Sequence, residues 1–323
     1  MRPLGVGELL DGAISALRAN PRTMLALTAV IVVLSQLIQL VLTLPVIGIT
    51  EDLGSVQPES DPDEALSALG SALASLALLY IAQFVVTFLS FHILVGLLAP
   101  VVGRAVLSDQ ISVREAWRQV RPRLLPLLGM ALLLLIVSVG PALLAIGLGV
   151  LLIAAGGPLA VAGGLLSGLG GLGALVASIW AYVTLAFATP ALVLERQPIR
   201  AAIARSRQLV RGSWWRVCGI LLLGLLLYFV VSSVLSTAFT LPFLFTVDFT
   251  ASEPAPVTML QIILGALGGI VSNGVTFPFG AAVVVLLYVD QRMRREGLDL
   301  ELARAAGAPG QPPPAAGTAP PGW

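Results

Sequence analysis

The sequence has little of the chemistry that hydrolytic enzymes use. In 323 residues there is one cysteine, Cys218, and one histidine, His92, and all 18 basic residues are arginine. A single cysteine excludes an intramolecular disulfide. A single histidine excludes a hydrolytic site built on a pair of histidines, so the sequence predicts no catalytic residue, no metal site and no cofactor.

Charge is equally scarce. Charged residues make up 11% of the chain and hydrophobic residues 57%, with a mean hydropathy of +0.97, whereas soluble domains have about 25% charged and roughly 45–50% apolar residues. Six runs contain no charged residue, and each is long enough for a helix to cross a bilayer, which takes about 20 residues. The sequence therefore predicts an all-α integral membrane protein with six transmembrane helices. They are expected at about 24–49, 66–103, 124–153, 174–194, 217–246 and 257–289.

The arginines are confined to alternate connections between these runs. By the positive-inside rule, the connections that carry arginine are cytoplasmic. We therefore expect a multi-pass protein of the bacterial cytoplasmic membrane with both termini inside the cell. The arginines fall within 2–22, 104–123, 196–216 and 292–304, whereas the other connections, 50–65, 154–173 and 247–256, have none.

This orientation divides the chain into four segments. Residues 1–22 are expected to form a cytoplasmic amphipathic helix on the membrane surface, and 23–290 the six-helix membrane domain. Residues 291–304 are expected to form a charged cytoplasmic helix. The Pro-, Ala- and Gly-rich residues 305–323 have no means of packing a core, so this tail is expected to be disordered.

Two further amphipathic helices are predicted on the cytoplasmic side. One begins at Ser112, where Glu115 completes a capping box, and the other occupies 198–211. On the second helix three arginines lie within about 20° of a common direction, because each residue turns the helix by about 100°. This basic stripe could bind anionic lipid or a protein partner, and the alternative is that it only fixes orientation. Its members are Arg200, Arg207 and Arg211.

The three amphipathic segments share a pattern. In each, a small residue is followed four positions later by Leu or Val and then Arg, and another Arg precedes the next span. The small residues are Ala13, Ala116 and Ser206, at intervals of 103 and 90 residues. We interpret the chain as three repeated units, each a surface helix plus a transmembrane hairpin. These units share one orientation, unlike the inverted repeats of many transporters.

Few polar side chains fall within the predicted spans. His92 and Asn273 are candidates for an intramembrane polar site, because polar groups are costly in hydrocarbon; a hydrogen bond to a neighbouring helix would explain His92 without any activity. In the sixth span, glycines and Pro278 within 268–278 predict an interrupted helix that could line a transport site, or a kink absorbed by its neighbours. The glycine-rich segment 156–173 is expected to be a tight apolar turn.

Three stretches of the chain carry a family resemblance. They are "RPLGVGELLDGAISALRANPRTML" at 2–25, "IARSRQLVRGSWWRVCGILLL" at 203–223 and "PFGAAVVVLLYVDQRMRREGLDLELA" at 278–303. The sequence resembles a group of actinobacterial multi-pass membrane proteins that are labelled as the membrane domain of glycerophosphoryl diester phosphodiesterase or as domains of unknown function. The resemblance implies a six-helix membrane module, which in the labelled proteins precedes a catalytic barrel. We expect no such catalytic domain here, because only a short helix and the tail follow the sixth span.

These observations leave three functional hypotheses. The favoured one is a non-catalytic membrane protein that binds anionic lipid head groups, or an unknown protein partner, through its arginine-rich cytoplasmic face; no nucleic-acid partner is expected. The alternative is a carrier or channel for a small or lipidic solute through the broken sixth helix, and this requires a continuous polar cavity. An enzyme acting on lipid phosphates is the least favoured, because the residues for that chemistry are lacking.

Overall fold

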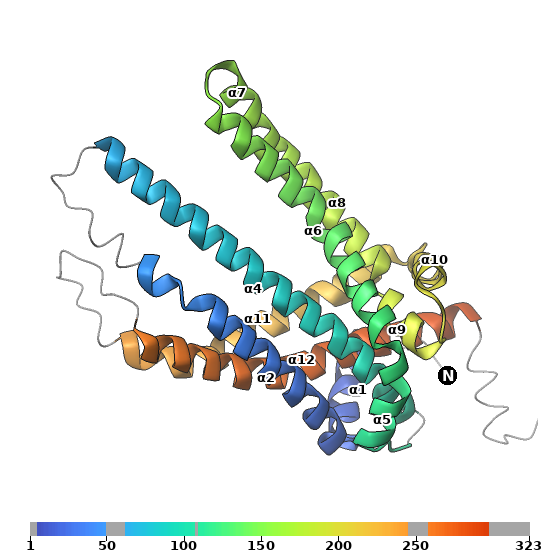
Figure 1. Ribbon diagram of the computed structural model, residues 1–323. Helices are drawn as coiled ribbons and strands as arrows, with labels where there is room; N and C mark the ends of the chain where they lie inside the picture. The colour runs from blue at the N-terminus through green and yellow to red at the C-terminus, as the bar shows by residue number, and fades with distance from the viewer. Residues whose placement is uncertain (1–4, 50–61, 107–108, 245–257, 297–323) are drawn as a thin grey trace, which may run out of the picture.

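The computed structural model describes residues 5–49, 62–106, 109–244 and 258–296, and every element in these ranges is a helix (Figure 1). Six of the helical segments are long and apolar enough to cross a membrane, which confirms the prediction of six spans. These segments are Pro21–Ile49, Ser67–Ala105, Val113–Ala154, Gly157–Leu194, Trp214–Leu241 and Met259–Arg295.

Three hairpins of long helices make up most of the structure. In each hairpin, two helices that are consecutive along the chain lie against each other. Apolar side chains around most of each helix suit a segment surrounded by lipid or by other helices. The hairpins are α2 (Pro21–Thr43) with α4 (Pro62–Ala105), α6 (Leu124–Ala154) with α8 (Gly171–Leu185), and α11 (Trp214–Leu244) with α12 (Met259–Glu296).

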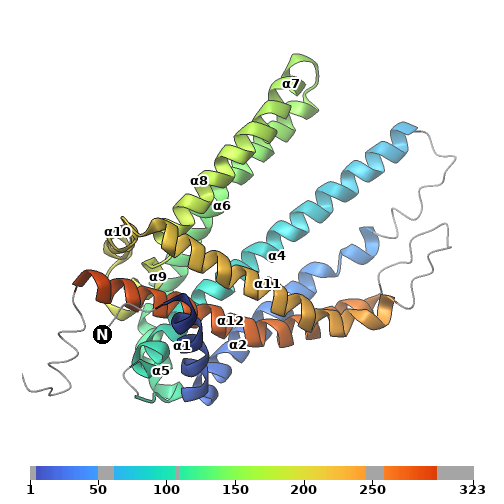
Figure 2. The ribbon, with the colours of Figure 1, turned by 180° about the vertical axis from the view of Figure 1, so that it is seen from behind.

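Four short helices lie at one end of the hairpins (Figures 1 and 2). They are α1 (Val6–Ala19), α5 (Val113–Val120), α9 (Ala188–Leu194) and α10 (Ile199–Val210). We call this the basic end, because the arginines of the described residues concentrate here. The start of α5 is as predicted, since the hydroxyl of Ser112 accepts a hydrogen bond of 3.3 Å from the backbone N–H of Glu115. The short helices α1, α5 and α10 directly precede α2, α6 and α11.

The short helices connect the hairpins in a ring. Helix α5 packs against α4, α10 packs against α8 and α9, and α1, at the start of the chain, packs against α12 at its end. The first long helix of each hairpin also contacts the second long helix of another hairpin. Helix α6 contacts α4, α11 contacts α8 and α2 contacts α12. Each of α1, α5 and α10 therefore contacts the second long helix of another hairpin, and so does the span that follows it.

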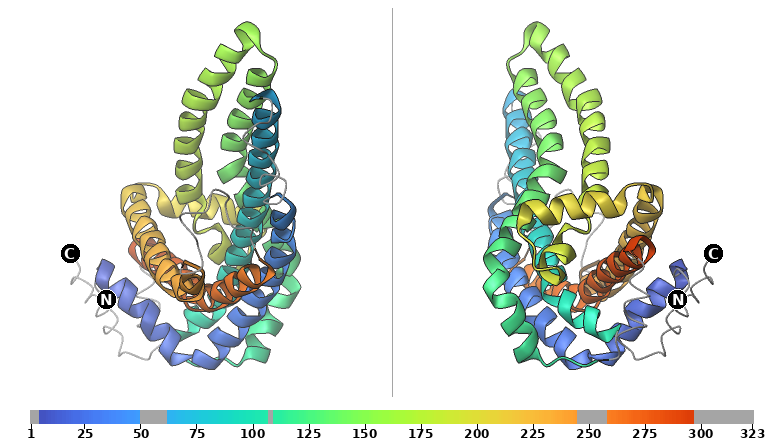
Figure 3. Two further views of the ribbon diagram at one scale, coloured as in Figure 1. Left: turned by 90° about the vertical axis from the view of Figure 1, so that its left-hand side faces the viewer. Right: turned by 90° about the vertical axis from the view of Figure 1, so that its right-hand side faces the viewer.

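The buried core lies towards the basic end, and the other halves of the hairpins diverge (Figure 3). Runs of buried apolar residues occur in the last part of α4, in α9 and in the last part of α12, which contact one another. Towards the opposite end, α6 and α8 separate from α4 and from the pair α11 and α12 (Figure 1). The bundle is thus closed at the basic end and splayed at the opposite end.

The prediction of a turn at 156–173 is wrong. Only Ala155 and Gly156 separate α6 from α7 (Gly157–Leu165), which continues through a π-helical turn at Leu166–Gly170 into α8. Glycine disfavours helix in water, but a backbone inside hydrocarbon must satisfy its hydrogen bonds internally, and a helix does this. The fourth span accordingly begins at Gly157 rather than near residue 174.

Of the two alternatives for the sixth span, the broken helix is wrong, since α12 is one helix from Met259 to Glu296 with Pro278 inside it. Its glycines instead allow other helices to approach. A Cβ on Gly269 would lie 2.6 Å from a side-chain oxygen of α2, and one on Gly280 would lie 3.1 Å from an aromatic ring of α4. Neighbouring helices therefore occupy the space that the small residues leave, and the helix continues.

Candidate functional site

The basic end contains a buried carboxylate at the end of α9. Glu195 has 8% of its side chain exposed, and Arg205 of α10 places its Nε atom 3.0 Å and 3.1 Å from the two carboxylate oxygens. The hydroxyl of Tyr288 on α12 donates a hydrogen bond to the same carboxylate, and Nε of Arg292 lies 3.8 Å from it. Glu195 therefore joins α9, α10 and α12.

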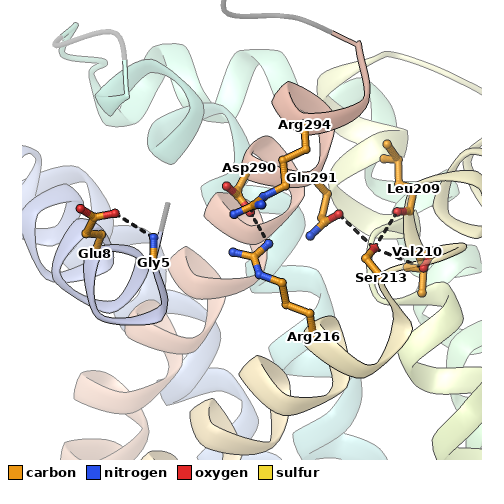
Figure 4. A network of polar contacts seen from close by, with 9 residues as sticks. All are labelled: Gly5, Glu8, Leu209, Val210, Ser213, Arg216, Asp290, Gln291 and Arg294. Atoms are coloured by element: carbon orange, nitrogen blue, oxygen red, sulfur yellow. Dashed lines mark hydrogen bonds and ion pairs between the residues drawn. The ribbon is translucent and has the colours of Figure 1, made fainter. Parts of the chain in front are cut away.

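A second buried carboxylate lies on the last turns of α12 (Figure 4). The side chain of Asp290 is 1% exposed, and one of its oxygens lies 2.7 Å from Nη1 of Arg216 and 2.9 Å from Nε of Arg294. Next to it, the hydroxyl of Ser213 donates a 3.0 Å hydrogen bond to the amide oxygen of Gln291. Asp290 and Gln291 thereby fix the start of α11 against the end of α12.

Ion pairs also attach two of the short helices to the preceding span. Arg104, near the end of α4, lies 2.8 Å from Glu115 of α5, in the same way that Glu195 pairs with Arg205 of α10. The Arg104 pair is more exposed, with both side chains 34% exposed. Buried carboxylates require such cationic partners, because an unpaired charge away from water is costly.

A hydroxyl group fixes α10 to the break between α8 and α9. The Oγ atom of Ser206 donates a 2.8 Å hydrogen bond to the carbonyl of Thr184 and accepts one of 3.2 Å from the N–H of Phe187. These backbone groups lie where α8 ends, so Ser206 satisfies groups that the helix cannot. The small residue of the sequence pattern is therefore completely buried here, as are its counterparts Ala13 and Ala116.

The predicted basic stripe lies on the opposite side of α10. Arg200, Arg207 and Arg211 are all exposed, and within the described residues none of the three side chains has a hydrogen bond or an ion pair. The buried side of the helix carries Ala202 and Leu209. The structure thus brings the three arginines together on one exposed surface, and whether they bind a ligand stays a prediction.

His92 lies in an aromatic cluster between α4 and α8. Its Nδ1 atom donates a 2.9 Å hydrogen bond to the carbonyl of Phe88, and its ring stacks on that of Phe88 with centroids 4.1 Å apart. The ring of Tyr182 meets its edge at 5.9 Å. Aromatic packing and a hydrogen bond within α4 thus account for the position of this imidazole.

Asn273 lies elsewhere and does not share a site with His92. Its amide oxygen accepts a 3.2 Å hydrogen bond from the hydroxyl of Tyr228 on α11. Two rings intervene, since Phe277 contacts Tyr228, and Phe91 contacts both Phe277 and His92. Over the described residues no group of three or more His, Cys, Asp and Glu side chains could hold a metal ion.

Among the hollows between the described spans, two are lined by apolar side chains. The larger, of about 470 Å³, lies between α4 and α6 and is lined by residues that include Tyr80, Phe84 and Gly140. The smaller, of about 280 Å³, lies between α2 and α12. A carrier of polar solutes needs a continuous polar cavity, and neither hollow supplies one.

Sequence reasoning missed the two buried carboxylates. The sequence predicted only a charged cytoplasmic helix after the sixth span, whereas in the structure Arg292 and Arg294 turn towards Glu195 and Asp290. The signal was present, because Glu195 and Asp290 are acids at the ends of charge-free runs in segments dominated by arginine. An acid in that position has guanidinium partners within reach once the hairpins assemble.

Together, the fold and the charged end define a six-span, all-helical membrane protein. The chain belongs to a family described as a domain of unknown function, DUF7847, which matches residues 4–291. That match covers the three hairpins and the short helices between them. No curated protein and no solved structure is detectably similar to the chain.

Proposed function

We propose that the chain is a non-catalytic protein of the bacterial cytoplasmic membrane that binds anionic lipid head groups through α10. The observation that carries this is the division of arginines on one helix. Arg205 turns inward and pairs with Glu195, whereas Arg200, Arg207 and Arg211 lie on the exposed side. The inward arginine is part of the fold, and the outward three are available to a ligand.

The energetics favour an anionic bilayer surface as that ligand. Each arginine near such a surface contributes about 1 kcal/mol, and guanidinium groups bind phosphate oxygens with paired hydrogen bonds. Trp215 is the second residue of the next span and is 83% exposed, and tryptophan concentrates at the depth of the head groups. Arginines beside an exposed tryptophan match the head group and the interface of a lipid.

We also propose that both termini of the chain are cytoplasmic and that the chain consists of three repeated units. Both described ends of the chain are in helices that meet at the basic end, α1 and α12, and the positive-inside rule puts that end in the cytoplasm. The ring of contacts supports three units of one orientation, because each short helix packs on the second arm of another hairpin. The three units are α1 with α2 and α4, α5 with α6 and α8, and α10 with α11 and α12.

Tryptophan quenching at the end of α10 tests the lipid proposal. A variant that keeps Trp215 and has Phe at the other four tryptophan positions is reconstituted with brominated phosphatidylglycerol or brominated phosphatidylcholine, diluted in unlabelled phosphatidylcholine. We expect stronger quenching by the anionic lipid. The combined substitution Arg200→Gln, Arg207→Gln and Arg211→Gln should remove this excess.

A matched control separates the stripe from total charge. Arg18 and Arg22 are exposed at the basic end but belong to α1 and α2, so Arg18→Gln with Arg22→Gln should leave the Trp215 signal unchanged. An equal excess of quenching in the α10 variant and the parent protein would overturn the proposal. The stripe would then serve orientation or a protein partner.

A further inference from the structure

A second exposed basic surface lies on α5 and on Arg121, the residue that follows it. Arg114, Arg118 and Arg121 are all exposed, and at about 100° per residue they occupy about 60° of the helix circumference. Trp117 borders them and is 43% exposed. We call these four residues the α5 surface; it is separate from the stripe of α10 and comes from another part of the chain.

The other side of α5 fixes the direction in which this surface points. Ala116 and Val120 are completely buried, so the helix cannot rotate without exposing them. Its one acidic residue, Glu115, lies 2.8 Å from Arg104. Within the described ranges the three arginines have no side-chain hydrogen bond or ion pair, so their charge is not neutralised by the protein.

We propose that the α5 surface binds the phosphate of an anionic lipid head group. The ligand class rests on the proposed function of α10, but the binding residues are different. Charge complementarity selects an anion, and two exposed apolar side chains select a lipid rather than a soluble phosphate. Trp117 borders the arginines, and Leu125, four residues after Arg121, is 82% exposed at the start of the next span.

The geometry therefore provides for both parts of a lipid molecule. Arginines with long flexible stems can reach head-group phosphates while their aliphatic parts stay on apolar surface. The exposed leucine marks where hydrocarbon begins. A folded protein partner would cover the arginines as well. It would not contact Leu125, however, because that side chain lies at the start of the span and faces the bilayer.

A local reporter tests this surface independently of α10. In a variant whose only tryptophan is Trp117, with Phe at the other four positions, brominated phosphatidylglycerol should quench more than brominated phosphatidylcholine in mixed bilayers. Replacing Arg114, Arg118 and Arg121 together by Gln should lower the preference at least tenfold, since each arginine contributes roughly fivefold. The triple Lys variant keeps the charge and should retain most of the preference.

The α10 variant serves as the control, because Arg200→Gln, Arg207→Gln and Arg211→Gln remove the same charge. It should leave the Trp117 signal unchanged. Equal preference in the α5 Gln variant and its parent overturns this inference, and the Trp215 experiment then decides the α10 proposal alone. Loss at Trp117 with no loss at Trp215 would sustain the α5 surface and reject the α10 proposal. Size-exclusion and circular dichroism profiles identical to the parent's show that the variants are folded.

Discussion

The two ends of the bundle are held together in different ways. In the most apolar stretch of α12, which crosses the core, 67% of the residues are buried, whereas the corresponding stretch of Gly157–Leu194 is 6% buried. The basic end has buried ion pairs around Glu195 and Asp290. At the opposite end the hairpins diverge (Figure 3), and many of their leucine, isoleucine and valine side chains are exposed.

The difference is expected for a membrane protein. In lipid, apolar side chains gain little by leaving the bilayer for another helix, so the far halves of the hairpins need not pack closely. At the basic end, apolar side chains are buried together and the buried carboxylates pair with arginines. The stability that holds the hairpins in one arrangement should therefore be concentrated at the basic end.

The largest effect is expected from removing the buried carboxylate of α12. Asp290→Ala leaves Arg216 and Arg294 without this partner, and breaking a buried pair costs roughly 3–5 kcal/mol. Both arginines are about 30% exposed, so water compensates in part and we expect about 2–4 kcal/mol. The free energy of unfolding, measured by SDS titration in mixed micelles, gives the value.

Asp109→Asn is the matched control for that measurement. Asp109 is 60% exposed and lies 3.7 Å from Arg104, and exposed pairs contribute at most about 1 kcal/mol. If the two substitutions cost the same, the distinction between the buried pair at Asp290 and exposed pairs elsewhere is wrong.

The sequence was sufficient for the number of spans but not for these pairs. Charge-free runs identify transmembrane helices because hydrocarbon excludes charge, and amphipathic spacing located α10 and its exposed arginines. The partners Arg216 and Asp290 are 74 residues apart, and they meet only because α11 and α12 form a hairpin of a particular register. Helix propensities measured in water likewise misled the reading of 156–173.

A second comparison is between a buried and a more exposed carboxylate. Each belongs to an ion pair that joins a short helix to the preceding span. Glu195→Ala removes partners of Arg205 and Tyr288, and we expect a loss of about 2 kcal/mol because hydrogen bonds to charged groups contribute about 1.5–3 kcal/mol. Glu115→Ala breaks the corresponding pair of α5, which is more exposed, and should cost about 0.5 kcal/mol. SDS titration of both variants makes the comparison; a larger loss for Glu115→Ala would contradict it.

A third pair of substitutions examines the opposite end, at the close contact between α6 and α7. A Cβ on Gly163 would lie 2.5 Å from the carbonyl oxygen of Gly149 on α6, whereas one on Gly164 would meet nothing within 4 Å. Gly163→Ala should therefore destabilise the hairpin by about 1–2 kcal/mol through overpacking. Gly164→Ala should change its stability by less than about 0.5 kcal/mol, because the added methyl group meets no neighbour.

The unfolding free energies of the two alanine variants decide whether the hairpin packs through Gly163. The pair Gly164 and Gly168, which sequence spacing alone would select for helix contact, has no neighbour at the Cβ position. If Gly164→Ala were the more damaging change, the contact between α6 and α7 would be on the other face of the helix.

The smallest effect on stability is expected when the outward arginines of α10 are replaced. This substitution also separates the contribution of the fold to stability from the contribution of lipid binding at the basic end. Replacing Arg200, Arg207 and Arg211 by Gln should change stability in phosphatidylcholine bilayers by less than about 0.5 kcal/mol, as is usual for surface positions. In phosphatidylglycerol the parent protein should gain up to about 3 kcal/mol, because a ligand that binds only the folded state stabilises it, and the variant should gain little.

Arg205→Gln on the same helix gives the opposite result if the division of arginines is correct. Arg205 pairs with the buried Glu195, so its loss should destabilise the protein in both lipids and leave the gain from phosphatidylglycerol intact. The comparison therefore has two independent readouts, stability in neutral lipid and the increment in anionic lipid. An inward and an outward arginine that changed both readouts alike would mean that α10 has no separate binding side.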